Sequence, residues 1–470
     1  MAKIKIDATL NSLVEYVNKM TYERLTPSAI HHTKKLLIDS LGCAIGGYSG
    51  EPCIIARNLA TSSTGNPPAR IIGSGIATTI EMATFSNSVM LRYLDFNDTY
   101  TSIGEGHPSD AIPAVLASAE AFHASGKTII AALAATYEVY MALADTVGLA
   151  ERGWDHGFFV VLASVAGTGK ILNLNSEQMA HAFSIAGSAN IPTRQTRRGE
   201  LSMWKGCATA LSAREGVFAT LLAKEGITGP PEAFEGKHGI WDQITGKFAL
   251  PILENKQNYF AVERSGIKFF PTEYHSHVPL LLLQQLGKDL VLENIKSIHI
   301  EANQRGYSET GNEPQRWDPQ TRETADHSLP YMLSIILTDG HLTIDSFQDQ
   351  RILDPALRPI MKKISVSENI EFTRNFPKLL QARVSVTTND GKVHVAEGNY
   401  PKGHEYDPMT DEEVELKFRE LCLREMSDEN TESLLDTLWH LEDAPNLNQI
   451  MNLMCFDPPK LTAVHSLIRD

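Results

Sequence analysis

The spacing of apolar residues changes twice along this chain, and these changes constrain its fold more than any other feature. From residue 1 to about 265, apolar residues recur with the 3.6-residue period of an α-helix, as at Leu37, Leu41 and Ala44. Near residue 268 this pattern gives way to shorter segments of β-like character, and the helical period returns after Pro401. The two ends of the chain therefore resemble each other, and the middle differs from both.

We predict an α+β protein in which a large all-helical domain is interrupted by a smaller α+β lid domain. The helical domain would comprise residues 1–267 and a return segment, 403–470, and the lid would comprise residues 268–402. The length of the chain supports two domains, because 470 residues exceed what a single hydrophobic core usually serves.

Local signals agree with this division. In the predicted lid, apolar and polar residues alternate at 384–386 and again at 393–395, and Asn-Asp-Gly at 389–391 supplies a turn, which together indicate a β-hairpin. In the return segment, Thr410 and Glu413 have the spacing of a capping box and predict the start of a helix.

Three stretches of the helical domain, 111–125, 129–149 and 158–172, are rich in Ala, Val and Leu and carry few charges. Such helices are buried on most sides or lie at a subunit interface. We therefore expect a homodimer that associates through the helical domain.

Composition argues against several classes of function. The net charge of −15 disfavours a nucleic-acid partner, which requires clustered Lys and Arg. We expect a cytoplasmic protein without membrane contact, because the N-terminus lacks a targeting signal and no apolar run reaches the roughly 18 residues that span a bilayer. The five scattered cysteines match neither a zinc site nor an iron–sulfur cluster, so we expect no metal and no cofactor.

The first candidate site is a Gly-containing loop at residues 94–110, which carries Asp95, Thr99 and His107 ahead of a buried helix. A second histidine, His156, also precedes such a helix. Histidine has the side-chain pKa nearest neutrality, and a helix N-terminus favours its neutral form as well as a substrate carboxylate. Helix capping alone is the plainer explanation for the Asp and Ser residues of this loop.

Residues 194–206 form a dense basic cluster in an otherwise acidic chain, and they include Arg194 and Lys205. A solvated loop is the plain alternative, because charge runs are often only surface. Arginine binds carboxylates in a bidentate manner, however, so the cluster also fits a polycarboxylate substrate.

Two further segments lie in the predicted lid. Residues 271–277 fall at the junction between the domains, where clefts commonly form, and contain His275 and His277. Their structural alternative is that one histidine packs in the interior and the other faces solvent. Residues 324–331 end in Tyr331 and, taken alone, would be interpreted as a helix cap.

Six phrases, taken together and in this order, resemble the MmgE/PrpD family: YLDFNDT, GHPSD, GELSMWKG, FPTEYHS, RETADHSLPY and YPKGH. The family includes 2-methylcitrate dehydratase, cis-aconitate decarboxylase and iminodisuccinate epimerase. The resemblance implies a helical domain with an inserted α+β lid, a homodimer, an active site between the domains and no required metal.

The resemblance also implies the positions of the site residues. It places these residues around the site: Asp95, Thr99, His107, His156, His275 or His277, and Tyr331. Lys205 follows the dehydratase pattern, because the decarboxylases carry their lysine a few positions earlier. His275 matches the dehydratase-type phrase, whereas His277 matches the decarboxylase-type histidine.

The leading candidate reaction is dehydration of 2-methylcitrate to 2-methyl-cis-aconitate, with citrate or aconitate as further substrates. The developing enediolate is multiply negative, so cations must stabilise it, and Arg194, Lys205 and Lys268 are the candidates. Arg194 and Lys268, with His277, are also the expected substrate-binding groups. A base and an acid are required as well. The candidate base is His107 or His156, the candidate acid is Tyr331 or the other histidine, and Asp95 would orient an imidazole.

Other functions remain open. Decarboxylation of cis-aconitate would use the same basic pocket, with a histidine or tyrosine protonating the product carbanion, and another polycarboxylate lyase or an epimerase of the family is also compatible. A non-catalytic polycarboxylate-binding protein is the alternative of a different class. Proton exchange at the substrate carbon separates an enzyme from a binder.

Overall fold

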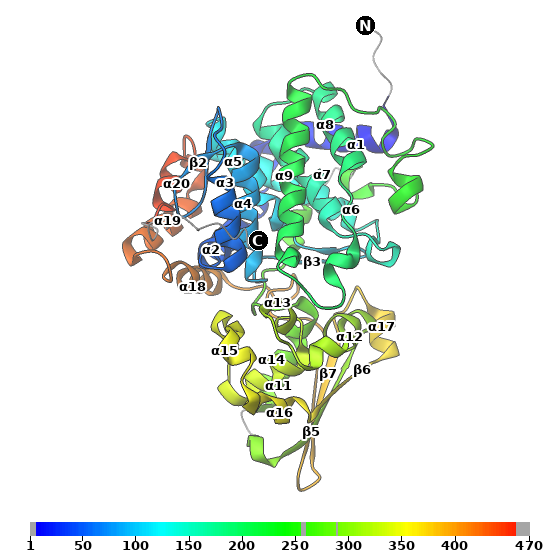
Figure 1. The fold of residues 1–470 in the computed structure, drawn as a ribbon. Coiled ribbons are helices and arrows are strands. Elements are labelled where there is room, and N and C mark those ends of the chain that lie inside the picture. The colour runs from blue at the N-terminus through cyan, green and yellow to red at the C-terminus, as the bar shows by residue number, and fades with distance from the viewer. Residues whose placement is uncertain (1–5, 255–259, 288–289, 457–470) are drawn as a thin grey trace, which may run out of the picture.

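The computed structural model describes residues 6–254, 260–287 and 290–456, which form two bodies (Figure 1). The larger body is helical and contains both the N-terminal part of the chain and its C-terminal return. The smaller body, below it in Figure 1, combines a sheet with helices. Each body has its own apolar core, and the chain passes from the first core to the second between Ile267 and Phe270.

The helices of the larger body begin at caps that are recognisable in the sequence. Thr79 caps α4, Asn175 caps α8 and Thr410 caps α18, each by accepting a hydrogen bond from a backbone N–H of the first turn. The predicted capping box of Thr410 and Glu413 is confirmed. The helices of this body are α1 (Ala8–Lys19), α2 (Pro27–Gly46), α3 (Glu51–Ala60), α4 (Ile80–Tyr93), α5 (Ile112–Ala121), α6 (Gly126–Ala144), α7 (Gly157–Ile171), α8 (Ser176–Ala189), α9 (Trp204–Lys224), α10 (Pro251–Glu254), α18 (Asp411–Cys422), α19 (Asp428–Trp439) and α20 (Asn448–Leu453).

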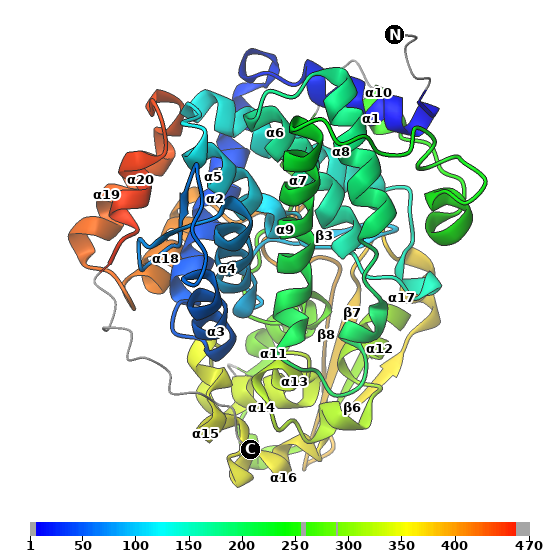
Figure 2. The ribbon, with the colours of Figure 1, turned by 45° about the horizontal axis from the view of Figure 1, so that its top comes forward.

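The core of the helical body joins segments that are distant in sequence. It runs from Leu10 to Ile267 and also includes residues from Met409 to Phe456, so the return segment packs on the same core (Figure 2). Helices α5, α6 and α7 are buried along almost their whole length. By length and composition α6 could cross a membrane, but 89% of its apolar window is buried inside the fold, as in the core helix of a globular domain.

The smaller body contains a four-stranded sheet of order β6-β5-β7-β8. Its strands are β5 (Ile295–Ala302), β6 (Ile364–Glu368), β7 (Ala382–Thr388) and β8 (Val393–Gly398). β5 pairs in parallel with β6 and antiparallel with β7, and β7 pairs antiparallel with β8. Helix α11 (His277–Gly287) packs on β7 and β8, and α14 (Leu329–Asp339) packs on α11. The shorter helices are α12 (Gln304–Thr310), α13 (Arg322–Ala325), α15 (Asp349–Ile352), α16 (Arg358–Met361) and α17 (Ile370–Asn375).

The predicted β-hairpin is confirmed as β7 and β8. Val384 and Val386 are fully buried, whereas Val393 and Val395 on the partner strand are exposed. Gly391 has φ +85° in the turn, a conformation that favours glycine. The mixed α+β class is therefore confirmed, while the boundaries at 267/268 and 402/403 and the action of the smaller body as a lid stay predictions.

Candidate active site

A cavity lies where the helical body meets the smaller body, and its wall takes residues from both. The helical body contributes Arg92, Asp95, Thr99, Thr101, Glu105, Gly106, His107, His156, Arg194 and Arg197, the crossover contributes Lys268, and the smaller body contributes Glu273, Tyr274, His275, Glu309 and His327. All four sequence segments singled out above, 94–110, 194–206, 271–277 and 324–331, therefore contribute to one site, as do His156, the crossover and α12.

The loop after α4 is held in place by short-range contacts. The Thr99 N–H donates to the Gly266 carbonyl at 2.8 Å, which ties the loop to the segment that leads into Lys268. Gly106 has φ +151°, and a Cβ on it would lie 2.6 Å from the His156 ring. Glycine at this position therefore allows His107 and His156 to lie together, with their ring centroids 5.6 Å apart.

Asp95 is the centre of a cluster of buried cations. Its carboxylate accepts from Arg92 at 2.6 Å and from Lys268 at 2.6 Å, and it lies 2.9 Å from the Lys205 ammonium. Burial alone would raise the pKa of Asp95, but these three cations hold it well below its usual range. Asp95 is therefore ionised and is shared by three cations.

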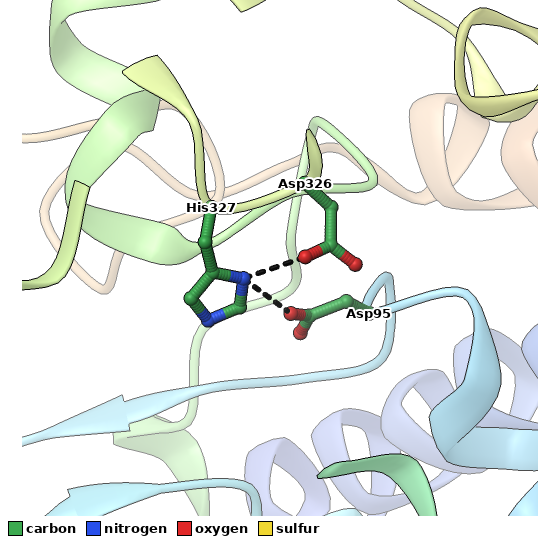
Figure 3. Close-up of side chains that lie close together, drawn as sticks. All are labelled: Asp95, Asp326 and His327. Atoms are coloured by element: carbon green, nitrogen blue, oxygen red, sulfur yellow. Dashed lines mark hydrogen bonds and ion pairs between the residues drawn. The ribbon is translucent and has the colours of Figure 1, made fainter. Parts of the chain in front are cut away.

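Lys205 also contacts a second carboxylate. Its ammonium lies 2.8 and 2.9 Å from the two oxygens of Asp326, whose Oδ1 accepts from His327 Nδ1 at 2.6 Å (Figure 3). Burial and the nearby Lys205 lower the pKa of His327 to about 4, so this imidazole is neutral. The first turn of α9 is pinned in turn by Arg197, which donates to the Lys205 carbonyl at 3.0 Å and to Asp155 at 2.9 Å.

Asp95, Asp326 and His327 offer ligand atoms within 4.8 Å of one another, which is a spacing that suits a metal ion (Figure 3). The Lys205 ammonium already bonds to both carboxylates. A divalent cation would have to displace that ammonium and would then meet Arg92 and Lys268 on the other side of Asp95. The charges around these residues fit a lysine better than a metal, and the expected absence of a metal stays a prediction.

His107 and His156 are neutral imidazoles. His107 Nδ1–H donates to the Asp98 carbonyl at 2.6 Å, and His107 Nε2 accepts from Arg92 at 3.0 Å. Burial, together with Arg92, holds the pKa of His107 well below its usual range. Burial also lowers the pKa of His156 to about 3, although Asp155 opposes the shift. The lone pair on His107 Nε2 is therefore occupied by the hydrogen bond from Arg92. Both imidazoles are weak bases.

Ion pairs connect the two bodies beside the cavity. Arg194 donates to Glu309 on α12 at 2.9 Å. Glu105 lies 3.4 Å from Arg305 and 3.5 Å from His275 Nε2, both in the smaller body. The arginines at this wall are thus balanced by protein carboxylates, and a polyanionic ligand would compete with those carboxylates for them.

Two family models match this chain. The MmgE/PrpD N-terminal domain matches residues 11–252, and the MmgE/PrpD C-terminal domain matches residues 270–441. The chain belongs to the MmgE/PrpD family. The resemblance predicted from the six phrases is confirmed.

Individual MmgE/PrpD relatives are distant but cover most of the chain. The 2-methylcitrate dehydratase of Cupriavidus necator is 26% identical over 425 residues, which are 85% of this chain and 86% of that protein. The 2-methylcitrate dehydratase of Escherichia coli K12 is 25% identical, with 85% and 86% covered. The human cis-aconitate decarboxylase is 25% identical over 476 residues, with 97% and 96% covered.

Most of the residues predicted for the site, from the MmgE/PrpD resemblance or as candidate cations, lie together. The cavity wall includes Asp95, Thr99, His107, His156, Arg194, Lys268 and His275. Lys205 lies directly behind Asp95 and bonds to it. The predicted site is thus compact, although the roles given to its members stay proposals.

Besides Lys205, which contacts Asp95 without lining the cavity, two predicted residues do not belong to the described cavity wall. The Tyr331 hydroxyl donates to the Ser346 carbonyl, and its ring packs near Phe347 in the core of the smaller body. His277 is fully buried, with its ring against Phe270 and Tyr274. Neither side chain lines the described cavity, so both are left out of the proposed chemistry, and their assignment to the site stays a prediction.

Five residues of the site in this MmgE/PrpD protein were missed as functional from the sequence: Arg92, Glu105, Glu273, Asp326 and His327. Arg92 had a usable signal, since it stands three residues before Asp95 at the end of a helix. Asp326 and His327 looked like part of a helix cap, but Ser328 is the cap of α14, and the two preceding side chains are left for the site.

Proposed function

We propose that this chain is a hydro-lyase that dehydrates 2-methylcitrate to 2-methyl-cis-aconitate. The observation that carries the proposal is the cluster of Arg92, Lys205 and Lys268 around the carboxylate of Asp95, at the cavity between the two bodies. The names of the relatives support the same reaction, since several are 2-methylcitrate dehydratases. Citrate and aconitate are further substrates to test.

The cationic cluster suits the difficult step of such a reaction. Removal of a proton next to a carboxylate produces an enediolate, which adds negative charge to an acid that is already multiply charged. Cations that are buried and fixed in advance stabilise this charge without reorganising. Because Asp95 holds Lys205 and Lys268 by hydrogen bonds at one place, we assign to Asp95 the positioning of these ammonium groups.

Two further arginines of the cavity wall suit recognition of substrate carboxylates. Arg194 and Arg197 line the wall, and guanidinium groups bind carboxylates with two parallel hydrogen bonds. The pairing of Arg194 with Glu309 shows that the guanidinium has the geometry to hold a carboxylate here. We assign Arg194 to substrate binding and Thr99 to the cavity wall beside the reacting carbons.

A second candidate is decarboxylation of cis-aconitate, which is favoured by the human decarboxylase relative that covers 97% of this chain. The same cations would bind the acid, and one proton donor would be enough to protonate the product carbanion. An epimerase or a non-catalytic binder of polycarboxylates would use the same arginines of the cavity wall, Arg194 and Arg197.

Incubation with 2-methylcitrate, citrate and cis-aconitate in deuterated water, followed by NMR, separates these functions. We expect 2-methylcitrate to lose water and to exchange a carbon-bound proton for deuterium. Release of carbon dioxide from cis-aconitate, with no dehydration of either hydroxy acid, would establish the decarboxylase instead. Binding without any exchange or product would indicate a binding protein.

A further inference from the structure

Among the described residues, three polar atoms on the wall contributed by the smaller body have no hydrogen-bond partner: the Tyr274 hydroxyl, Oε2 of Glu273 and Nδ1 of His275. Of these groups, Glu273 and His275 are the two that can exchange a proton near neutral pH, because burial raises the pKa of Tyr274 far above that range. Buried polar atoms in folded proteins are almost always paired, so each such atom needs an explanation. A substrate that enters the cavity would supply the missing partner for both.

The backbone around these two residues is fixed. The Glu273 N–H donates to the Asp326 carbonyl at 2.9 Å, and the Glu273 carbonyl accepts from the Ser276 hydroxyl at 2.6 Å. The single turn Tyr274–Ser276 then leads into α11. His275 Nε2 faces Glu105 at 3.5 Å, which leaves Nδ1 as its other ring nitrogen. The backbone of Glu273 and the ring of His275 are therefore held in place at the cavity, with Oε2 of Glu273 and Nδ1 of His275 unpaired.

The environment of the site raises the pKa of both groups. Burial raises the pKa of Glu273 to about 7, and Glu309 and Glu105 add to the rise, while His275 and Lys268 oppose it. Burial alone would lower the pKa of His275, but Glu273 and Glu105 raise it against the opposing charge of Arg305. Near neutral pH Glu273 is therefore partly ionised, and the shift of His275 favours its protonated form, in contrast to the neutral and engaged His107.

We propose that Glu273 and His275 are the proton-transfer pair of this site, with Glu273 as the base and His275 as the acid. The assignment rests on the proposed dehydration. Elimination of water needs one group that takes a proton and one that gives a proton, and an ionised Glu273 with a protonated His275 supplies both. The pair lines the same cavity as Asp95, Arg92 and Lys268, so a substrate in that cavity can reach the pair and these cations.

The step balances in atoms and charge. The Glu273 carboxylate takes the proton from the carbon next to the substrate carboxylate, and the electrons of that C–H bond form the C=C bond. The C–O bond of the adjacent carbon breaks, and its electron pair leaves with the hydroxyl oxygen, which receives the His275 proton and departs as water. The pair then holds one proton on Glu273, and transfer of that proton to His275 restores the starting state.

The variant Glu273→Gln tests this assignment, because it keeps the shape of the side chain and removes its basicity. We expect kcat on 2-methylcitrate to fall about a hundredfold or more, with substrate binding by calorimetry changed little, since a general base contributes on this scale. Glu273→Asp should retain more activity than Glu273→Gln. Glu371→Gln, which alters an exposed carboxylate on α17, is the matched control and should behave as the wild type.

The pH profile adds a readout that a purely structural role would not change. The wild-type rate should fall as pH drops below about 7, because Glu273 must be ionised to act, and residual activity of Glu273→Gln should lack this limb. Equal kcat in wild type and Glu273→Gln, or a rise in KM alone, would overturn the pair while leaving the dehydration intact. A wild-type protein that dehydrates no tested acid would overturn the proposed function and the pair together.

Discussion

At the scale of single residues, the site depends on one carboxylate that serves three cations. Asp95 has φ +50°, a left-handed conformation that aspartate tolerates better than most residues, and this turn directs its side chain back toward Arg92. The sequence indicated Asp95 and Lys205 by their motifs. It could not indicate that they bond to each other, because Lys205 reaches Asp95 from the first turn of a different helix.

A prediction at this scale concerns metals. We expect turnover to survive exhaustive chelation, because the Lys205 ammonium already bonds to both carboxylates of the cluster formed by Asp95, Asp326 and His327. Activity measured before and after treatment with a chelator and dialysis checks this. Loss of turnover that one specific metal restores would contradict it.

At the scale of secondary-structure elements, turns and helix caps could be predicted from the sequence. The side of an element on which a given side chain packs could not. The β7–β8 hairpin and the start of α18 follow from turn and cap residues that act within a few positions. Tyr331 lies in the first turn of α14, where its side chain could face either the core or the site. Packing of α14 in the core of the smaller body decides that direction, and no local signal encodes it.

The short segment Arg194–Arg197 provides the prediction at this scale. Arg194→Gln should raise KM about tenfold or more and leave kcat nearly unchanged, because loss of a charge-assisted hydrogen bond weakens ground-state and transition-state binding alike. Glu309 stays paired in the variant, since Arg198 lies 3.2 Å from it. Arg214→Gln on α9 is a control at a half-exposed arginine. A fall in kcat with KM unchanged would speak against a binding role for Arg194.

At the scale of the whole molecule, two cores built from an interrupted chain place the site between them. The change in apolar period near residue 268 predicted this interruption, because the spacing of apolar residues distinguishes helices from strands. The expected dimer does not follow from the helices that first suggested it. Helices α5 and α6 were one reason to expect it, yet both are buried inside the chain and so are not free to form an interface.

A homodimer nevertheless stays our prediction, because the helical body leaves apolar side chains exposed elsewhere. Ile55 and Leu59 on α3 and Phe218 on α9 are each about half exposed, and apolar surface of this kind suits a subunit interface. Light scattering at micromolar concentration should give twice the chain mass of 51.9 kDa. A mass equal to one chain would refute the dimer.

The central claim is that buried cations stabilise charge as it develops, and Lys205→Met tests it most directly. If the Lys205 ammonium acts mainly in the transition state, kcat on 2-methylcitrate should fall about a hundredfold or more, by comparison with removal of an oxyanion donor, and KM should change much less. Lys237→Met, at an exposed lysine, should match the wild type, and circular dichroism should show that both variants are folded. A folded Lys205→Met protein with unchanged kcat would contradict the account.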